Sequence, residues 1–213
     1  MVNSWRDYFN TSAFFGFVEL EPWLGPGSSL ATFRTAQLAT LSAITDVGYA
    51  TGTDIGDPLG AGFGSVHPRN KKLIGRRLAN AALDVSYGMP AQWLPPVYKS
   101  ASASAAGAAL TVTVTFDNVP STLVPTDDRC HTEIPYNVSF AACAWFSVVA
   151  SDGSVLNATA AVGADGTSVV LTATAATPGL TAVATAFGFN AWPINMIKSA
   201  EGFPIRPWNF TRI

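Results

Sequence analysis

Hydrophobic and polar positions follow two different patterns along the chain, and the change falls near residue 93. Before that point, most apolar side chains recur at helical spacing, with one short apolar run that is typical of a buried strand. After it, short runs rich in Val, Thr and Ala are separated by Gly, Pro, Asp and Ser, which is typical of β-strands joined by turns. We therefore expect an α/β unit over residues 1–93 and a β-rich unit over residues 94–213.

The first half predicts a helix followed by one strand. The helix begins at Ser28 or Ser29 and continues to about Ser42. The strand covers residues 46–53, DVGYATGT, and Asp54 stands at its carboxyl end. Sites in open α/β sheets gather outside the carboxyl ends of strands, so this end is where we expect chemistry.

A longer helix is predicted over residues 68–87. Pro68 suits the first position of a helix, and Gly88 supplies a stop. A stripe of apolar side chains at helical spacing marks the face that packs on the core: Ile74, Leu78, Ala81 or Ala82, and Val85. His67 then occupies the cap position, where the positive end of the helix dipole favours neutral imidazole over imidazolium.

The second half predicts an antiparallel β-sandwich. Turn sequences such as ASDGS and GADGT separate some of the runs, and the alternation of apolar and polar side chains favours strands with one buried face. The candidate strands are residues 109–116, 138–150, 154–162, 167–175 and 180–189.

Composition narrows the classes of partner. A net charge of −2 and the absence of a basic run argue against nucleic acid. Polar residues break the apolar stretches before they reach the ~18 residues of a membrane span, and the N-terminal residues lack a basic-then-apolar leader pattern. No Cys-x-x-Cys motif or His/Cys cluster points to a metal, and we expect no cofactor.

Cysteines and glycosylation sequons bear on the compartment. Cys130 and Cys143 are either two thiols or a disulfide that closes a short loop. Asn-x-Ser/Thr sequons exceed the roughly two expected by chance. They lie at Asn10, Asn137, Asn157 and Asn209. This excess favours a secretory route, so we expect a secreted or lysosomal glycoprotein as the parent protein.

His67 is the main candidate for acid–base chemistry. It lies in GFGSVHPRNKK, after a glycine-rich loop that follows the predicted strand. Asp54 and Asp57 precede it, and either carboxylate could hold the imidazole in the orientation that a general base needs. The alternative is a surface or helix-capping histidine, because a lone histidine is a weak motif.

Two polar side chains, Arg34 and Gln37, fall on the packing face of the helix predicted to end near Ser42. The other members of that arc are apolar: Leu30, Phe33, Leu38 and Leu41. Polar groups on a packing face need partners. The pair is therefore either a structural tie or part of a substrate-binding site.

A nucleophile to accompany His67 is not evident. The GPGSS sequence around Ser28 lacks the Gly-x-Ser-x-Gly pattern of a nucleophile elbow. Ser65 is only two residues from His67, which is poor geometry for attack, and both cysteines lie in the β-rich half. The chain therefore contains a candidate base without its nucleophile.

Several segments resemble sialate O-acetylesterases, members of the SGNH/GDSL hydrolase superfamily. In family order they are MVNSWRDYF, FRTAQLATLSAITDVGYATGTDIGDP, FGSVHPRNKKLIGRRLANAAL, LPPVY and AFGFNAWPINMIKSAEGFPIRPWNF. The His-Pro-x-x-Lys segment at residues 67–71 is the most specific of them. The family's Arg-x-x-Gln pair before the strand is similar to Arg34 and Gln37.

The resemblance implies an activity and a missing part. In that family the histidine of His-Pro is the catalytic base, which carries over to His67, and a serine in a Gly-Gln-Ser-Asn segment attacks the acetyl ester. This chain has no such segment, so it resembles the C-terminal part of an esterase, and we expect it to be inactive alone. Many members of the superfamily carry Asp two or three residues before the histidine, where this chain has Ser65 and Gly64. Asp54 and Asp57 are therefore the candidate orienting acids.

The resemblance also implies a fold and a substrate class. Residues 1–93 resemble the rear part of an α/β/α SGNH hydrolase domain, which an antiparallel β-sandwich follows, and the substrate is an O-acetylated sialic acid or a related acetylated sugar. Two alternatives stay open. The chain belongs to an esterase acting on another acetylated polysaccharide, or it is a non-catalytic sugar-binding module. In the second case tryptophans stack on sugar rings instead of packing in cores, and the candidates are Trp23, Trp93, Trp192 and Trp208.

Overall fold

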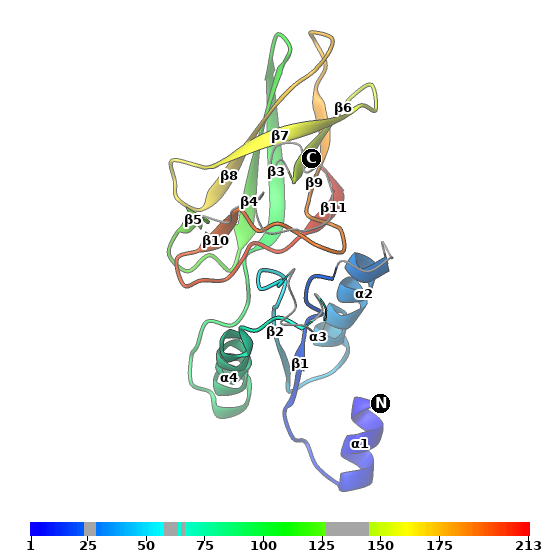
Figure 1. Ribbon diagram of the computed structural model, residues 1–213, viewed down its shortest axis with the longest axis vertical. Helices are drawn as coiled ribbons and strands as arrows, with labels where there is room; N and C mark the ends of the chain where they lie inside the picture. The colour runs from blue at the N-terminus through cyan, green and yellow to red at the C-terminus, as the bar shows by residue number, and fades with distance from the viewer. Residues whose placement is uncertain (24–28, 58–63, 65–66, 127–144) are drawn as a thin grey trace. The chain divides into compact units, whose positions relative to one another are not determined.

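The computed structural model describes most of the chain, namely residues 1–23, 29–57, 64, 67–126 and 145–213. Cys130, His131, Asn137 and Cys143 lie outside the described residues, so the disulfide and the sequon predicted there are not addressed. The chain divides into two compact units, Met1–Leu94 and Pro95–Ile213 (Figure 1). No helix in the described part of the chain is long and apolar enough to cross a membrane.

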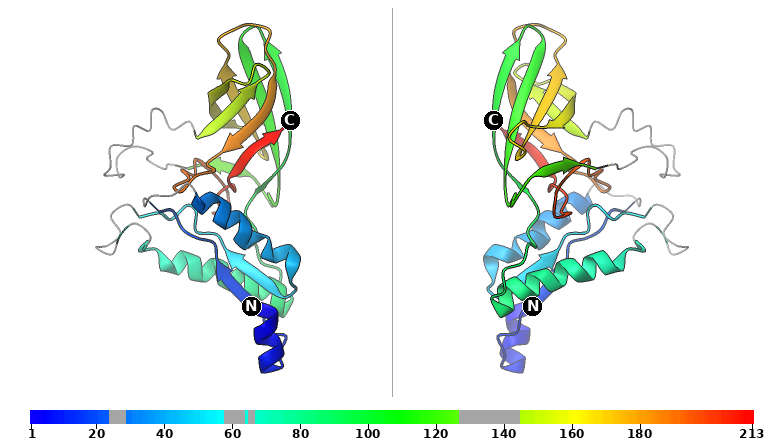
Figure 2. Two further views of the ribbon diagram at one scale, coloured as in Figure 1. Left: turned by 90° about the vertical axis from the view of Figure 1, so that its right-hand side faces the viewer. Right: turned by 90° about the vertical axis from the view of Figure 1, so that its left-hand side faces the viewer.

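The first unit is a small parallel sheet with helices (Figures 1 and 2). Its elements are α1 (Val2–Phe9), β1 (Phe15–Val18), α2 (Ser29–Leu38), α3 (Thr40–Ala43), β2 (Val47–Ala50) and α4 (Lys71–Tyr87). β1 and β2 pair in parallel, with Phe15 opposite Val47 and Val18 opposite Ala50. The helix predicted to end near Ser42 is present, but it divides into α2 and α3.

β2 is buried along its whole length, which is typical of a parallel strand that is covered on both faces. Tyr49 stacks on Phe17 of β1 and meets the edge of Trp93. Gly48 allows α4 to approach closely, because a Cβ at this position would lie 2.9 Å from the Cβ of Ala81. Packing therefore fixes the strand and, with it, the position of its carboxyl end.

The predicted apolar stripe of α4 is confirmed. Ile74 and Ala81 are buried, and Leu78 and Val85 pack against the same two core clusters. Gly88 ends the helix with a left-handed φ of 62°, a conformation that glycine adopts without a steric penalty.

The predicted start of α4 is wrong. The helix begins at Lys71, and its cap is Asn70, whose Oδ1 accepts a hydrogen bond from the N–H of Leu73 at 3.4 Å. Pro68 is therefore not the first helical residue, and His67 is not the cap. The physical reason is that a short amide side chain presents an oxygen acceptor to the free N–H groups of the first turn.

The second unit contains strands and no helix within its described residues, 95–126 and 145–213. They are β3 (Val97–Ala106), β4 (Ala109–Asp117), β5 (Leu123–Pro125), β6 (Phe146–Ala150), β7 (Val155–Val162), β8 (Ser168–Thr174), β9 (Ala182–Phe187), β10 (Ile197–Ser199) and β11 (Trp208–Arg212). Seven of them form one antiparallel sheet in the order β11-β9-β6-β7-β8-β4-β3, while β5 pairs with β10. The strands predicted at 109–116, 154–162, 167–175 and 180–189 correspond to β4, β7, β8 and β9. Within residues 138–150, the described part contains β6.

The seven-stranded sheet curls into a nearly closed barrel instead of the expected β-sandwich. Its two edge strands, β3 and β11, lie close together. The hydroxyl of Tyr98 on β3 donates a hydrogen bond to the carbonyl of Arg212 on β11 at 3.4 Å. The rings of Tyr98 and Trp208 lie 5.4 Å apart. Both edge strands carry register shifts, and such bulges increase local bending. Alternating burial is common to sandwiches and barrels, so the sequence pattern did not distinguish them.

Aromatic side chains fill the interior of this curled sheet. The ring of Trp208 lies 5.9 Å from Phe116, 6.0 Å from Phe146 and 5.3 Å from Phe187. Its indole N–H donates to the hydroxyl of Thr185 at 2.8 Å, which satisfies the one polar atom of a buried side chain. Trp208 therefore belongs to the core of the second unit.

Candidate functional site at the carboxyl ends of the parallel strands

Three segments of the first unit converge at the carboxyl end of its parallel sheet. After β1 the chain continues the pairing with β2 through Glu19, whose N–H donates to the carbonyl of Ala50 at 2.9 Å. It then reaches Glu21. The segment after β2, residues 51–57, leaves the same edge. The first turns of α4 contact both segments through Lys71 and Arg77. This is the edge at which α/β sheets place their sites.

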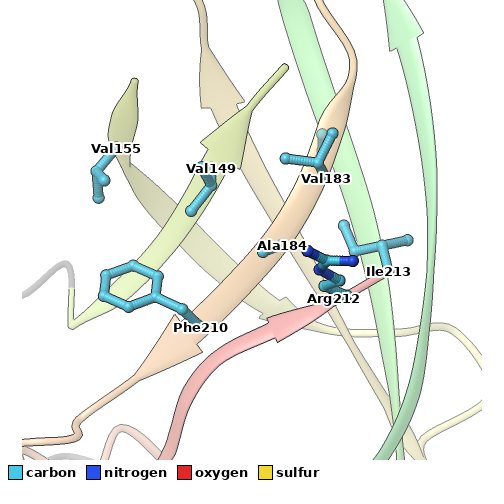
Figure 3. Close-up of a pocket in the computed structure, with 8 residues that line it drawn as sticks. Val149, Val155, Val183, Ala184, Phe210, Arg212 and Ile213 are labelled. Atoms are coloured by element: carbon cyan, nitrogen blue, oxygen red, sulfur yellow. The ribbon is translucent and has the colours of Figure 1, made fainter. Parts of the chain in front are cut away.

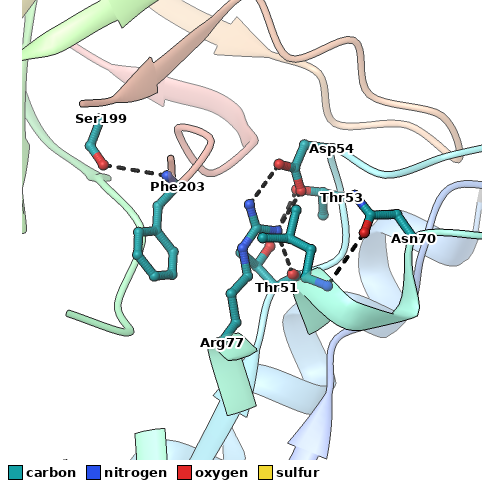
Figure 4. Close-up of polar contacts among 8 residues, drawn as sticks. Thr51, Thr53, Asp54, Asn70, Arg77, Ser199 and Phe203 are labelled. Carbon is teal, nitrogen blue, oxygen red and sulfur yellow. Dashed lines mark hydrogen bonds and ion pairs between the residues drawn. The ribbon is translucent and has the colours of Figure 1, made fainter. Parts of the chain in front are cut away.

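Arg77 and Asp54 form an ion pair that ties α4 to the end of β2 (Figure 4). The guanidinium donates to both carboxylate oxygens, at 2.6 and 2.7 Å, and to the carbonyl of Thr51 at 2.8 Å. The side chain of Arg77 is 1% exposed. Two-point pairs of this kind fix geometry as well as charge. Both oxygens of Asp54, one of the two predicted orienting acids, therefore accept hydrogen bonds from an arginine.

The second predicted orienting acid, Asp57, also lies against an arginine. Arg69 Nε donates to one carboxylate oxygen of Asp57, and Arg69 Nη2 donates to the other at 3.1 Å. Asp57 is buried, whereas 64% of the Arg69 side chain is exposed. The structure thus brings each aspartate to an arginine, and their proposed role toward His67 stays a prediction.

His67 lies on the surface in the turn that precedes α4. Its backbone N–H donates to the carbonyl of Gly64 at 3.1 Å. Among the described residues, no side chain forms a hydrogen bond with the imidazole. The exposed ring is therefore accessible to a reacting group.

Glu21 is the carboxylate that binds Lys71, the first residue of α4. Its side chain is only 9% exposed, and both carboxylate oxygens accept hydrogen bonds from Lys71 Nζ, at 3.3 and 3.2 Å. Burial raises the pKa of Glu21, while Lys71 and the nearby charge of His67 lower it. Gly52 makes room for this side chain, because a Cβ there would lie 2.7 Å from Glu21 Cγ.

Sequence reasoning missed Glu21, although one signal was present. Lys71 stands at the N-terminus of α4, where the helix dipole disfavours a cation and where no acidic residue occupies the first turn. A lysine at such a position needs a carboxylate from elsewhere. The sequence does not reveal which carboxylate, because Glu21 and Lys71 are 50 positions apart and only the fold brings them into contact.

Arg34 and Gln37 tie α2 to the segment that follows β1. Arg34 donates to the carbonyls of Leu20 and Glu21, at 2.6 and 3.0 Å. Gln37 accepts from the N–H of Leu20 at 3.0 Å and donates to the carbonyl of Val18 at 3.1 Å. Burial lowers the pKa of Arg34, and the carboxylate of Glu19 raises it. These contacts are the structural tie that the helical pattern allowed, and a role in substrate binding stays a prediction.

No family model matches the chain, and no curated protein matches it. A solved structure does match over 98% of the chain, with a TM-score of 0.68 and 27% sequence identity. It is described as a novel carbohydrate acetylesterase from Xanthomonas citri. The chain resembles part of a carbohydrate acetylesterase. The match covers 44% of that protein, so this chain spans less than half of its length.

The resemblance to a carbohydrate acetylesterase agrees with the ester-hydrolase class that the sequence segments indicated. It does not select a sugar, and it does not assign a role to any residue of this chain. Within the described residues, no group of three or more His, Cys, Asp or Glu side chains is arranged to hold a metal ion.

A separate groove of about 650 Å³ lies on the second unit (Figure 3). It is lined by Val149, Val155, Ala182, Val183, Ala184, Phe210, Arg212 and Ile213. Phe210 is 53% exposed. Within the described residues, the guanidinium of Arg212 forms no ion pair, so the groove combines an exposed aromatic ring with an uncompensated cation.

The structure also places the other predicted surface features. Trp93, Trp192 and Trp208 are buried, which confirms core packing for these three, whereas Trp23 is 38% exposed. Three of the sequons are exposed and lie at Asn10, Asn157 and Asn209. Their glycosylation stays a prediction.

Proposed function

We propose that this chain forms part of a carbohydrate O-acetylesterase in which His67 acts as the general base. The observation that carries the proposal is the resemblance of nearly the whole chain to part of a carbohydrate acetylesterase. His67 lies in the turn before α4, and the first residue of α4, Lys71, binds Glu21 in the segment that follows β1, which supports the proposal. In this reaction a serine hydroxyl attacks the acetyl carbonyl and His67 takes its proton. Water then hydrolyses the acetyl-enzyme and releases acetate.

In this proposal the serine is supplied from outside the 213 residues. The Gly-Gln-Ser-Asn segment that carries the nucleophile in sialate O-acetylesterases does not occur in the sequence. The serine hydroxyl must come within hydrogen-bond reach of His67 for proton transfer. The exposed imidazole leaves space for such an approach.

An O-acetylated sialic acid is the substrate that the sequence resemblance favours, and an acetylated plant or microbial polysaccharide is the alternative. Each substrate presents the same acetyl ester on a different sugar. Acetate release from the two, measured beside that from an aryl acetate, separates substrate recognition from the chemical step.

A chimera tests the proposal. In the chimera, this chain replaces the matched 44% of the Xanthomonas citri acetylesterase. A second chimera that carries His67→Ala is compared with it. We expect acetate release from the parent chimera and a loss on the order of 10⁴-fold in the His67→Ala chimera. Equal turnover by two correctly folded chimeras would refute His67 as the base. The 213-residue chain alone should release no acetate.

The groove on the second unit favours a second candidate function, which is binding of a sugar that carries a carboxylate. The ring of Phe210 can stack on a sugar face, and Arg212 can pair with the carboxylate. N-Acetylneuraminic acid is the probe, and N-acetylglucosamine is its neutral counterpart. Unglycosylated protein is used, because the sequon at Asn209 adjoins Phe210.

Calorimetric titration should show binding of the acidic sugar that Phe210→Ala and Arg212→Gln each abolish. Lys99→Gln is the control, because Lys99 lies on β3 outside the groove and its side chain is 60% exposed. Binding of both sugars with equal affinity, or loss of binding in the Lys99 variant, would contradict a carboxylate site at Arg212.

A further inference from the structure

We propose that Asn157 is an N-glycosylation site whose attached glycan lies across the groove on the second unit and stacks on Phe210. The proposal goes beyond the esterase function. It rests on the second candidate function only in that both place a sugar on the same groove. The placement follows from the register of the four strands that carry the groove, β11, β9, β6 and β7.

The groove gathers the exposed apolar side chains of the second unit. Within the described residues of that unit, every large hydrophobic side chain that is exposed lines this groove, namely Val155, Val183, Phe210 and Ile213. Exposed apolar side chains that are concentrated in one place mark a surface that binds another group. The groove therefore needs an occupant, and the strands that form it show which one lies within reach.

The register of β6 and β7 places Asn157 on the face of the sheet that carries the groove. Val155 lies opposite Val149, and both side chains line the groove. Asn157 follows two positions later on β7, opposite Ser147 on β6. Side chains two positions apart on a strand project from the same face. Asn157 therefore projects from the groove face, where it is exposed.

The row that begins at Asn157 leads across the sheet to Phe210. Ser147 lies opposite Ala186 on β9. The irregular part of β11 between Trp208 and Thr211 contains Phe210 and faces Ala186. β7 and β11 are three strand spacings apart, so at ~4.8 Å per spacing the row is about 14 Å long. The first two sugar rings of an N-linked glycan can cross such a span.

The side chains along this row suit a sugar. Ser147 and Ala186 are small, so they leave a low floor between the asparagine and the aromatic ring. Phe210 and Arg212 both line the groove (Figure 3). The ring of Phe210 offers an apolar surface to the face of a sugar. The guanidinium of Arg212 offers N–H donors to hydroxyl and acetamido oxygens.

The covalent step uses a donor from the secretory route. Residues 157–159 form an Asn-Ala-Thr sequon. The side-chain nitrogen of Asn157 forms a bond to the anomeric carbon of an oligosaccharide that is carried on a lipid diphosphate. The bond from that carbon to the diphosphate breaks, the nitrogen loses a proton, and the lipid diphosphate leaves. The attached sugar then has a high effective concentration at the groove, so it binds even where the same free sugar binds weakly.

The test is NMR of the 213-residue chain, secreted from eukaryotic cells that are supplied with carbon-13-labelled N-acetylglucosamine. The other sequons are removed by Asn10→Gln, Asn137→Gln and Asn209→Gln, so that a glycan is attached only at Asn157. Mass spectrometry should find Asn157 occupied. The ring current of Phe210 should shift protons of the first sugars upfield from their positions in the free glycan. Phe210→Leu keeps an apolar side chain without the ring, and it should abolish this shift.

A chain that keeps only the sequon at Asn10 is the matched control. Asn10 is exposed and belongs to the first unit, so Phe210→Leu should leave its sugar resonances unchanged. An unoccupied Asn157 in the secreted, folded chain overturns the proposal. It is equally overturned by an upfield shift that persists in Phe210→Leu, or by sugar resonances at Asn157 that coincide with those at Asn10.

Failure of the second candidate function is measured separately. The calorimetric titration with N-acetylneuraminic acid uses unglycosylated protein, so a lack of binding there refutes a site for free acidic sugar. The NMR shifts of the attached glycan are recorded without any free sugar, and they alone decide whether the glycan at Asn157 contacts Phe210.

Discussion

Arg77 donates to both carboxylate oxygens of Asp54, at 2.6 and 2.7 Å, from a side chain that is 1% exposed. This ion pair joins α4 to the segment that follows β2. Asp57 makes a similar two-point pair with Arg69, whose side chain is 64% exposed. The two aspartates have the same chemistry, but their arginines lie in different surroundings.

This difference predicts unequal costs for removing the two aspartates. Asp54→Ala leaves a buried guanidinium without its partner and should destabilise the first unit by about 3–5 kcal/mol. Asp57→Ala leaves an arginine that water already solvates and should cost about 1 kcal/mol or less for the lost pair. Urea unfolding followed by tryptophan fluorescence compares the two. Equal costs would show that the burial of Arg77 does not determine the strength of its pair.

The corrected start of α4 predicts which residue stabilises it. Asn70→Ala removes the side-chain cap and should cost about 1 kcal/mol of unfolding free energy. His67→Ala should leave that free energy nearly unchanged, because the histidine lies outside the cap. A larger loss from His67→Ala than from Asn70→Ala, measured by the same urea titration, would restore His67 as the cap.

Glu21 predicts a specific pH dependence of stability. Burial raises its pKa above the usual 4.5, so the folded state holds the proton more tightly than the unfolded state does. The stability that this carboxyl contributes is present at low pH and is lost as the pH rises through the raised pKa. Relative to Glu21→Gln, the parent should therefore become less stable between acidic and neutral pH. A difference in unfolding free energy that is constant across this window would contradict the prediction.

The core of the second unit predicts the effect of a single hydroxyl. Thr185→Val keeps the shape of the side chain but leaves the indole N–H of Trp208 buried without its acceptor. The expected cost is about 1–3 kcal/mol. Thr115→Val is the matched control, because Thr115 makes its hydroxyl contact with Ser100 at an exposed place, and it should change stability by about 0.5 kcal/mol or less. Similar losses from the two variants would show that burial of the Trp208 bond is unimportant.

The two units should differ in protection from hydrogen exchange. β8 pairs with β4 on one side and β7 on the other, and its interior side chains are fully buried. β2 has a strand partner only in β1 within the described residues. Backbone amides of residues 168–174 should therefore exchange more slowly than those of residues 47–50. Equal protection of the two segments would show that the first unit is as stable as the second.

Much of the local structure could be predicted from the sequence. The stripe from Ile74 to Val85 and the stop at Gly88 gave most of α4, because helical period and glycine conformation are local properties. The start of the helix was misplaced, since Asn70 and His67 are both acceptable near a first turn and the competition between them is settled by backbone geometry. β3 was not predicted, because its Ser/Ala alternation carries little apolar signal, and pairing with β4 from Val97 to Ala106 stabilises it instead.

The sequence by itself determined the two-part organisation and most strand positions, and it gave His67 as the candidate general base, which stays a prediction. Only the tertiary structure decided that one sheet curls on itself, that Asp54 and Asp57 pair with arginines, and that Glu21 binds Lys71. The physical reason is that periodicity and turn chemistry act over a few residues and are visible along the chain. Charge pairing and sheet closure join residues that are far apart in sequence, and their partners are selected by the packing that brings those residues together.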